Sequence, residues 1–320
     1  MPSELRRFFV LLFKKPLTGF SFVLSVSSLV FLPAPGYYQK IQSSWQKPQV
    51  SGSHFVLPPP VLYPKSISGV GPPEISAKGV VVLDPVSSVR LFEKNSQDRF
   101  LPASTSKIMT ALVAMDTFRP EEILTVPTLV DNGQDIKLIE GEKITAANLL
   151  YALLVASAND AAETLANSDP GGRANFIKKM NEKSQMLSLK NTAFVNPTGI
   201  DEKGEYTSVF DLAVLTREAL RRPLFAALVA TQKITIQSID GTHRHEMENI
   251  NQLLGKIDGV VGVKTGQTEG AGECLVTYIT RGEEKLIIVL LASKDRFGET
   301  EKLIDWAFGN FEWFTPTPNL

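Results

Sequence analysis

Cysteine and histidine are scarce in this sequence of 320 residues, and their scarcity excludes two kinds of site. The single cysteine, Cys274, cannot form an internal disulfide, so cysteine content does not indicate the compartment. Only three histidines are present, His54, His243 and His245. A Ser-His-Asp triad needs a histidine beside its nucleophile, and a zinc peptidase usually needs more than one. His243 and His245 alternate along a predicted strand without a motif partner, so we expect surface or packing residues.

The sequence also has no excess of either positive or negative charge. The sequence holds 33 basic and 34 acidic residues, and the formal net charge of −1 gives no indication of a nucleic-acid partner. Hydrophobic residues make up 43% and charged residues 21%, which is typical of an ordinary globular core. The length suffices for one large domain or two small ones.

The N-terminal apolar run, residues 16–32, falls just short of the ~18 residues that indicate a spanning helix. Four basic residues precede it, namely Arg6, Arg7, Lys14 and Lys15. This order is typical of an export signal or of a membrane anchor whose N-terminus is cytoplasmic. Ala34 is followed by Pro35, so a clean cleavage site is missing. We expect residues 1–34 to anchor the protein in the cell membrane with the remainder outside the cytoplasm. A cleaved signal, and hence an exported protein, is the alternative.

A proline-rich stretch follows, with nine of the 20 prolines between Pro33 and Pro73. Proline favours extended backbone without internal hydrogen bonds, so residues 35–74 are predicted to be a semi-rigid linker. About 40 residues at ~3.1 Å each would span on the order of 120 Å at most. Residues 75–320 are predicted to form the catalytic domain.

Within this domain, strands are expected at both ends and helices between them. Residues 78–85 and 88–95 predict a hairpin, and strands return in "GVVGVKTG", "ECLVTYITRG" and "EKLIIVLLASK". The expected helices span residues 104–117, 145–157, 159–167, 172–187 and 208–222, and a final one covers 296–314. Thr145 is a predicted N-cap. This order predicts an α+β fold, in which an antiparallel sheet is flanked by helices and carries an inserted helical lobe.

One predicted helix start carries a Ser-x-x-Lys motif, Ser104 and Lys107. Residues three apart on a helix are neighbours, and the free N–H groups of a helix start face a group beside its first residue. The motif alone is weak, because Ser44 and Lys47 in the linker repeat it by chance. On this motif alone, Ser104 as a simple helix cap and Lys107 as a solvated lysine are the favoured roles.

Two further motifs follow in a fixed order. Ser157 and Asn159 come after the apolar helix, and Lys264-Thr265-Gly266 lies on a predicted strand, where Gly266 allows another backbone to approach. The ordered triple is specific, whereas each motif alone is not. With "LPASTSKIMTALVA", "LLVASANDAAETLA", "FVNPTGID" and "DGVVGVKTGQTEGAGECLV", residues 75–314 resemble the serine-type D-alanyl-D-alanine carboxypeptidases. These are the low-molecular-mass penicillin-binding proteins of peptidase family S11.

The resemblance implies a β-lactamase/DD-peptidase-like fold and a set of roles for the motif residues. Ser104 would be the acylated nucleophile and Lys107 its base, with a pKa lowered by burial and by the charge of Lys264. Ser157 would relay the proton and Asn159 would orient Lys107 and the substrate amide. The substrate-binding group would be Lys264, Thr265, Gly266 and Gln267, and the backbone N–H groups of Ser104 and Gln267 would form the oxyanion hole.

The implied substrate is a peptidoglycan stem peptide that ends in D-Ala-D-Ala. β-Lactams would be covalent inhibitors, and the reaction needs neither a cofactor nor a metal. Many relatives carry a C-terminal β domain and an amphipathic anchor helix, and neither is expected in a sequence that ends at Leu320. Ala158 and Gln267 depart from the residues that are more frequent in the family, which concerns substrate preference.

Two alternatives remain open. A class A β-lactamase would share the fold and the triple, but its E-x-x-L-N loop lies well after the second motif. Here the nearest match, Glu163 to Asn167, lies only six residues after Ser157 and is predicted to be surface helix. A non-catalytic wall-binding or β-lactam-sensing protein could also keep the fold, although all the motif residues are intact.

Overall fold

The computed structural model describes residues 61–129 and 133–315. The predicted anchor at residues 1–34 and most of the predicted linker at 35–74 lie outside the described residues. Within the two described ranges, no helix has both the length and the apolar character that crossing a bilayer requires.

Strands occur at both ends of the described chain and helices occupy its middle, in the order that the sequence predicts. The strands are β1 (Tyr63–Ser66), β2 (Gly79–Leu83), β3 (Arg90–Lys94), β4 (Ile123–Thr125), β5 (Lys143–Thr145), β6 (Lys233–Gln237), β7 (Arg244–Glu248), β8 (Val260–Thr268), β9 (Gly272–Arg281), β10 (Glu284–Ser293) and β11 (Phe311–Phe314). The helices are η1 (Ala103–Ser106), α4 (Lys107–Thr117), α5 (Ala146–Val155), α6 (Asn159–Asn167), α7 (Gly172–Met186), α8 (Val209–Leu220), α9 (Pro223–Val229) and α10 (Arg296–Asn310).

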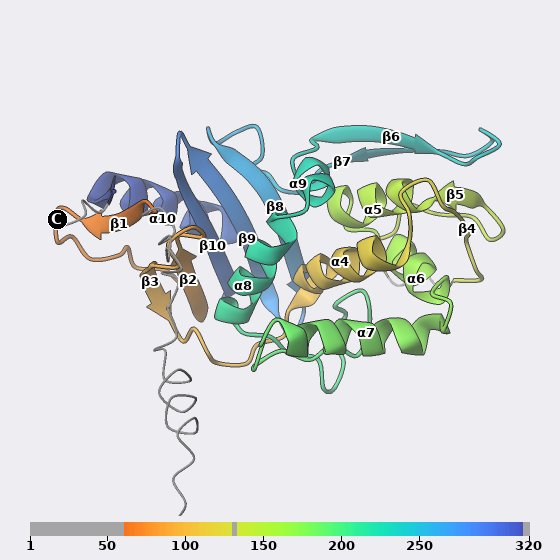
Figure 1. The fold of residues 1–320 in the computed structure, drawn as a ribbon, viewed down its shortest axis with the longest axis horizontal. Coiled ribbons are helices and arrows are strands. Elements are labelled where there is room, and N and C mark those ends of the chain that lie inside the picture. Colours follow the sequence, from red (N-terminus) through yellow and green to blue (C-terminus); the bar gives the residue numbers. More distant parts are fainter. Residues whose placement is uncertain (1–60, 130–132, 316–320) are drawn as a thin grey trace, which may run out of the picture. The chain divides into compact units, whose positions relative to one another are not determined.

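The central sheet has five antiparallel strands in the order β3-β2-β10-β9-β8. Strand β2 from the start of the domain pairs with β10 from its end, so that Val80 lies opposite Leu290. Helix α8 packs on one face of this sheet and α10 on the other (Figure 1). The predicted α+β architecture is therefore confirmed.

Strands β2 and β10 are apolar on both faces because helices cover both faces of the sheet. In β2, Val81 and Leu83 belong to the core shared with the helical lobe, whereas Val80 and Val82 pack with α10. Successive side chains of a strand point to opposite faces, so an unbroken apolar run fits a strand between two layers.

The helical lobe is inserted between β3 and β8 and contains helices α4 to α7 (Figure 1). Its α5 begins where the sequence predicts, because the Thr145 side chain accepts a hydrogen bond from Asn148 N at 3.2 Å. Seven of the ten residues of α5 are buried, as expected for a nearly all-apolar helix. The β6–β7 hairpin packs against α5.

The last predicted helix, residues 296–314, is wrong over its final four residues. Helix α10 ends at Asn310, and β11 then pairs with β1 in an antiparallel two-stranded sheet. β1 lies inside the predicted linker, so ordered structure begins before the predicted boundary at residue 75. Alternating burial along "FEWF" and its aromatic content favour a strand over a helix.

Candidate active site

The Ser104 turn is a short 3-10 helix and not the first turn of an α-helix. Ser104 lies in η1, and α4 begins at Lys107. Neither helix start has a side-chain cap, so the simple capping role considered for Ser104 is wrong. The preceding residue, Ala103, has a positive φ of 47°. Such a conformation costs on the order of 1–3 kcal/mol for a non-glycine residue and persists only where its surroundings enforce it.

Two glycines enclose this strained turn. A Cβ on Gly199, whose φ is +82°, would lie 1.9 Å from the carbonyl oxygen of Ala103. A Cβ on Gly266 would lie 2.9 Å from Ala103 Cβ and 3.0 Å from Ser104 N. The close backbone approach expected at Gly266 is therefore observed, and its partner is the Ser104 turn itself.

Lys107 is fully buried, and its ammonium nitrogen has three hydrogen-bond partners. Nζ lies 2.9 Å from Ser104 Oγ, 2.6 Å from Asn159 Oδ1 and 2.8 Å from the carbonyl oxygen of Thr198. The first two motifs thus meet at one atom. Oδ1 of Asn159 and the carbonyl of Thr198 are both acceptors, so they orient the hydrogens of Nζ and direct its remaining site towards Ser104.

Burial lowers the pKa of Lys107 from its ordinary value to about 7. The negative charges of Asp135, Asp160 and Glu163 act in the opposite direction and keep the pKa from falling further. A lysine with this pKa is neutral in a substantial fraction of molecules at neutral pH, which a general base requires. The predicted lowering by burial is confirmed.

The charge of Lys264, expected to lower the pKa of Lys107, is not among the causes of that shift, whereas the charge of Lys107 does lower the pKa of Lys264. Burial, then the charges of Lys107 and Arg296, hold the pKa of Lys264 well below its usual range. Its Nζ donates to Ser157 Oγ at 2.8 Å and to the carbonyl oxygen of Thr265 at 2.9 Å. A carboxylate bound beside Lys264 would favour its protonated form, because an opposite charge stabilises a buried cation.

Ser157 contacts Lys264, whereas Asn159 of the same motif contacts Lys107. Ser157 has a positive φ of 60° at the end of α5, and its side chain is almost completely buried. This conformation turns the chain from α5 into α6 and brings Ser157 Oγ to Lys264 and Asn159 to Lys107. The short helix end "VASAND" therefore serves both lysines.

Thr265 and Arg296 present unused polar atoms next to the third motif. Thr265 Oγ1 and Arg296 Nε are buried and have no hydrogen-bond partner among the described residues. Arg296 Nη1 donates to the carbonyl oxygen of Gly266 at 2.8 Å, which fixes the guanidinium beside β8. Unpaired buried polar atoms are costly in a folded protein, and these two lie beside the third motif. Gln267, two residues after Thr265 on β8, is exposed.

Sequence reasoning missed the roles of the "NPTGID" segment and of Arg296. Asn196 Oδ1 accepts hydrogen bonds from the backbone N–H groups of Thr198 and Gly199 at 3.1 and 2.7 Å. This turn aims the Thr198 carbonyl at Lys107 and lays Gly199 against Ala103. The Asn-Pro-Thr-Gly sequence is a recognisable turn, but its position opposite the nucleophile comes only from the tertiary fold.

A buried carboxylate behind the nucleophile was also missed. Glu205 accepts a hydrogen bond from Ser106 Oγ at 2.9 Å and another from Val195 N at 2.7 Å. Burial raises the pKa of Glu205 to about 7. Since Ser106 lies between Ser104 and Lys107 in the sequence, Glu205 supports the turn from its inner side.

Glu163 does not occupy the position of a second base. It lies on α6, as predicted, and its carboxylate forms an ion pair with Arg173 at 2.7 Å. Its side chain is more buried than the predicted surface position implies, with 13% exposure. In residues 61–129 and 133–315, no group of three or more acidic, histidine or cysteine side chains is arranged to hold a metal ion.

Comparison with known proteins agrees with this geometry. The D-alanyl-D-alanine carboxypeptidase DacF of Bacillus subtilis is 33% identical over 246 residues, which cover 74% of this chain and 63% of that protein. DacD of Escherichia coli, also a D-alanyl-D-alanine carboxypeptidase, is 33% identical over 258 residues, or 75% of this chain and 65% of that protein. The chain spans a little under two thirds of the length of these curated relatives.

Solved structures resemble the described fold. The Streptomyces K15 DD-transpeptidase has a TM-score of 0.70 at 30% identity and covers 75% of this chain and 100% of its own. Penicillin binding protein 5 from Haemophilus influenzae has a TM-score of 0.71 at 31% identity, covering 77% and 74%. The expected DD-peptidase-like fold is thereby confirmed. The family model of peptidase S11, D-alanyl-D-alanine carboxypeptidase, matches residues 67–295, and the chain belongs to this family.

Proposed function

We propose that this protein is a serine-type D-Ala-D-Ala carboxypeptidase that removes the terminal D-Ala from peptidoglycan stem peptides. The observation that carries the proposal is the contact between Lys107 Nζ and Ser104 Oγ at 2.9 Å, with Lys107 buried and its pKa near 7. A buried amine at hydrogen-bond distance from a serine hydroxyl is an activated nucleophile–base pair.

Acylation transfers one proton and exchanges one bond. Neutral Lys107 takes the hydroxyl proton while Ser104 Oγ bonds to the carbonyl carbon of the penultimate D-Ala. The backbone N–H groups of Ser104 and Gln267 stabilise the oxyanion that forms. The C–N bond to the terminal D-Ala then breaks, and the proton passes from Lys107 through Ser157 to the leaving amine. Water attacks the ester, gives a proton back to Ser104 and releases the shortened peptide.

Recognition of a free carboxylate makes the reaction exo-acting. Lys264, the unpaired Thr265 hydroxyl and the Arg296 guanidinium form a group of donors beside β8. A carboxylate accepts several charge-assisted hydrogen bonds at once, which matches this set of donors. A peptide whose C-terminal carboxylate is blocked as an amide is therefore expected to be a poor substrate.

The direct test measures D-Ala released by the purified full-length chain from a peptide ending in D-Ala-D-Ala. Ser104→Ala should abolish release, whereas Ser44→Ala in the chance Ser-x-x-Lys repeat should leave it unchanged. Intact-protein mass spectrometry after incubation with penicillin should show one adduct, on Ser104. A folded protein that neither releases D-Ala nor forms the adduct would contradict the proposal and favour the non-catalytic wall-binding or β-lactam-sensing function.

Rapid turnover of penicillin would instead favour the β-lactamase alternative. The pairing of Glu163 with Arg173 argues against it, because both carboxylate oxygens already accept hydrogen bonds from the guanidinium. A transpeptidase reaction, the activity named for the Streptomyces K15 protein, would use the same acyl-enzyme with an amine acceptor in place of water. Attachment to the cell membrane through residues 1–34, or export after cleavage, completes the proposal, and mass spectrometry of the mature N-terminus tests it.

A further inference from the structure

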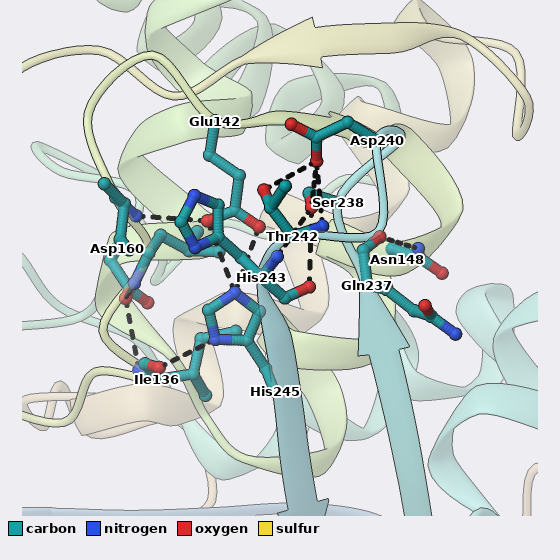
Figure 2. Close-up of polar contacts among 12 residues, drawn as sticks. Ile136, Glu142, Asn148, Asp160, Gln237, Ser238, Asp240, Thr242, His243 and His245 are labelled. Carbon is teal, nitrogen blue, oxygen red and sulfur yellow. Dashed lines mark hydrogen bonds and ion pairs between the residues drawn. The ribbon is translucent and has the colours of Figure 1, made fainter.

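His245 is buried near the start of β7, and both of its ring nitrogens have partners. Nδ1 lies 3.2 Å from the carbonyl oxygen of Ile136, and Nε2 lies 3.0 and 3.3 Å from the two carboxylate oxygens of Glu142 (Figure 2). The Glu142 side chain is fully buried and that of His245 is 8% exposed. His245 is therefore a buried packing residue, one of the two roles expected for it, and its partner Glu142 lies 103 positions away in the sequence.

The chemistry of this contact indicates a fixed geometry. The Ile136 carbonyl and the Glu142 carboxylate lie at different ring nitrogens, so the two contacts together fix the orientation of the imidazole ring. Glu142 accepts a further bond from Ile139 N at 3.1 Å, which fixes its own carboxylate. A buried polar contact of this kind adds little net stability compared with apolar side chains of similar volume. Its contribution is geometric, because it defines the position of the segment to which His245 is bound.

That segment, residues 134–138, is hydrogen-bonded on its other side to the first turn of α6. Asp160 Oδ2 accepts from Ile136 N at 3.1 Å and from Leu138 N at 3.0 Å. The backbone carbonyl of Gln134 accepts from Asn159 N at 2.6 Å. Segment 134–138 therefore lies between β7 and the start of α6, held by His245 on one side and by Asp160 on the other (Figure 2).

The first residue of α6 is Asn159, whose side-chain oxygen accepts from Lys107 Nζ at 2.6 Å. A displacement of segment 134–138 would move the partner of the Asn159 backbone and with it the orientation of Lys107. A shift of about 1 Å away from the productive geometry is enough to lower a reaction rate strongly.

We propose that His245 and Glu142 are positioning residues for the reaction at Ser104. They hold segment 134–138 against α6 and thereby set Asn159 and the general base Lys107. This inference rests on the proposed function for its kinetic test, whereas its structural test is independent of any activity.

The test compares substitutions of His245 in the full-length chain. Asn places its amide nitrogen near the position of the histidine Nδ1 and keeps the bond to Ile136, whereas Leu removes both bonds. His243→Asn is the matched control, because the hydrogen bonds found for His243 involve only its backbone. The readouts are amide hydrogen exchange in residues 133–142 and the second-order rate constant for acylation of Ser104 by a fluorescent penicillin.

His245→Leu is expected to accelerate exchange in residues 133–142 and to lower acylation about tenfold, as for loss of one hydrogen bond to a buried group. His245→Asn should restore most of the rate, and His243→Asn should match the wild type. In an Asn159→Ala background, His245→Leu should cause no further loss, because its effect passes through Asn159. A merely structural role would lower the rate again in that background.

Unchanged exchange in His245→Leu, or an additional tenfold loss in the Asn159→Ala background, would overturn the inference. If His245→Leu does not fold, Glu142→Gln provides the same comparison, since it retains the size of the side chain and weakens only the bond to His245. A wild-type protein that shows no acylation would contradict the proposed function, and the exchange measurements would still decide whether His245 holds the segment.

Discussion

The pKa of Lys107 predicts the pH dependence of acylation. Lys107 acts as a base only when neutral, and burial lowers its pKa to about 7. At pH 6 about a tenth of the molecules would have a neutral Lys107, and at pH 8 about nine tenths would. The rate constant for acylation by penicillin should therefore rise about tenfold between pH 6 and pH 8, with a midpoint near pH 7.

A charge substitution near Lys107 should move this midpoint in a known direction. The charge of Asp135 is the first of the electrostatic contributions that raise the pKa of Lys107. Asp135→Asn removes this charge but keeps an oxygen to accept the hydrogen bond that Asp160 N donates to Oδ1 at 3.0 Å. The midpoint should therefore fall, and acylation at pH 6 should be faster in the variant than in the wild type.

A second group with a pKa of about 7, Glu205, lies behind the nucleophile and needs a control. Stopped-flow acylation is measured from pH 5 to pH 9 for the wild type, Asp135→Asn and Glu205→Gln, with circular dichroism to confirm folding. The midpoint near pH 7 should persist in Glu205→Gln. A rate independent of pH, or a midpoint that disappears only in Glu205→Gln, would refute the assignment of Lys107 as the base.

Three further substitutions test other parts of the site. Gly199→Ala places a Cβ 1.9 Å from the Ala103 carbonyl oxygen and should abolish acylation, or destabilise the fold by more than about 3 kcal/mol in urea unfolding. Thr265→Val should leave stability within about 0.5 kcal/mol, because its hydroxyl has no internal partner, but should raise KM for a free-carboxylate peptide about tenfold or more. Glu205→Gln should flatten the stability–pH curve. The raised pKa of Glu205 means that its protonated form stabilises the folded wild type fully below about pH 4.5, and this contribution is lost as the pH rises to about 7. Glutamine cannot ionise, so the variant should be more stable than the wild type at pH 8, by on the order of 2–3 kcal/mol.

The sequence predicted the architecture because its main elements have strong local patterns. The apolar run of α5, its Thr145 cap and the antiparallel strands at both ends of the domain all agree with the structure. The last four residues of the final predicted helix, "FEWF", form a strand because they pair with β1. The local sequence does not reveal this partner, which lies at the other end of the domain.

The order of the motifs identifies the candidate active site from the sequence, but it does not identify the residues from other loops that hold these motifs in place. Ser104 and Lys107 lie three positions apart, so their proximity follows from local geometry. The carbonyl of Thr198 and the glycine at 199 reach the same turn from a distant loop, and that contact exists only in the folded state. Capping of a helix by Ser104 is a reasonable local hypothesis, yet the chain forms a 3-10 turn at this point, with two glycines packed closely against it.

The pairing of β2 with β10 also determines when the central sheet can form during synthesis. Val80 waits for Leu290, 210 positions later, which at ~5–20 residues per second takes roughly 10–40 s on the ribosome. Until then β2 has only β3 beside it, and its other edge remains unpaired and open to pairing with another chain. Lys264 and Thr265 also arrive late in this order. A nascent or truncated chain therefore carries Ser104 for a long interval without the groups proposed to bind its substrate, and it is expected to be inactive until its last strands have been added.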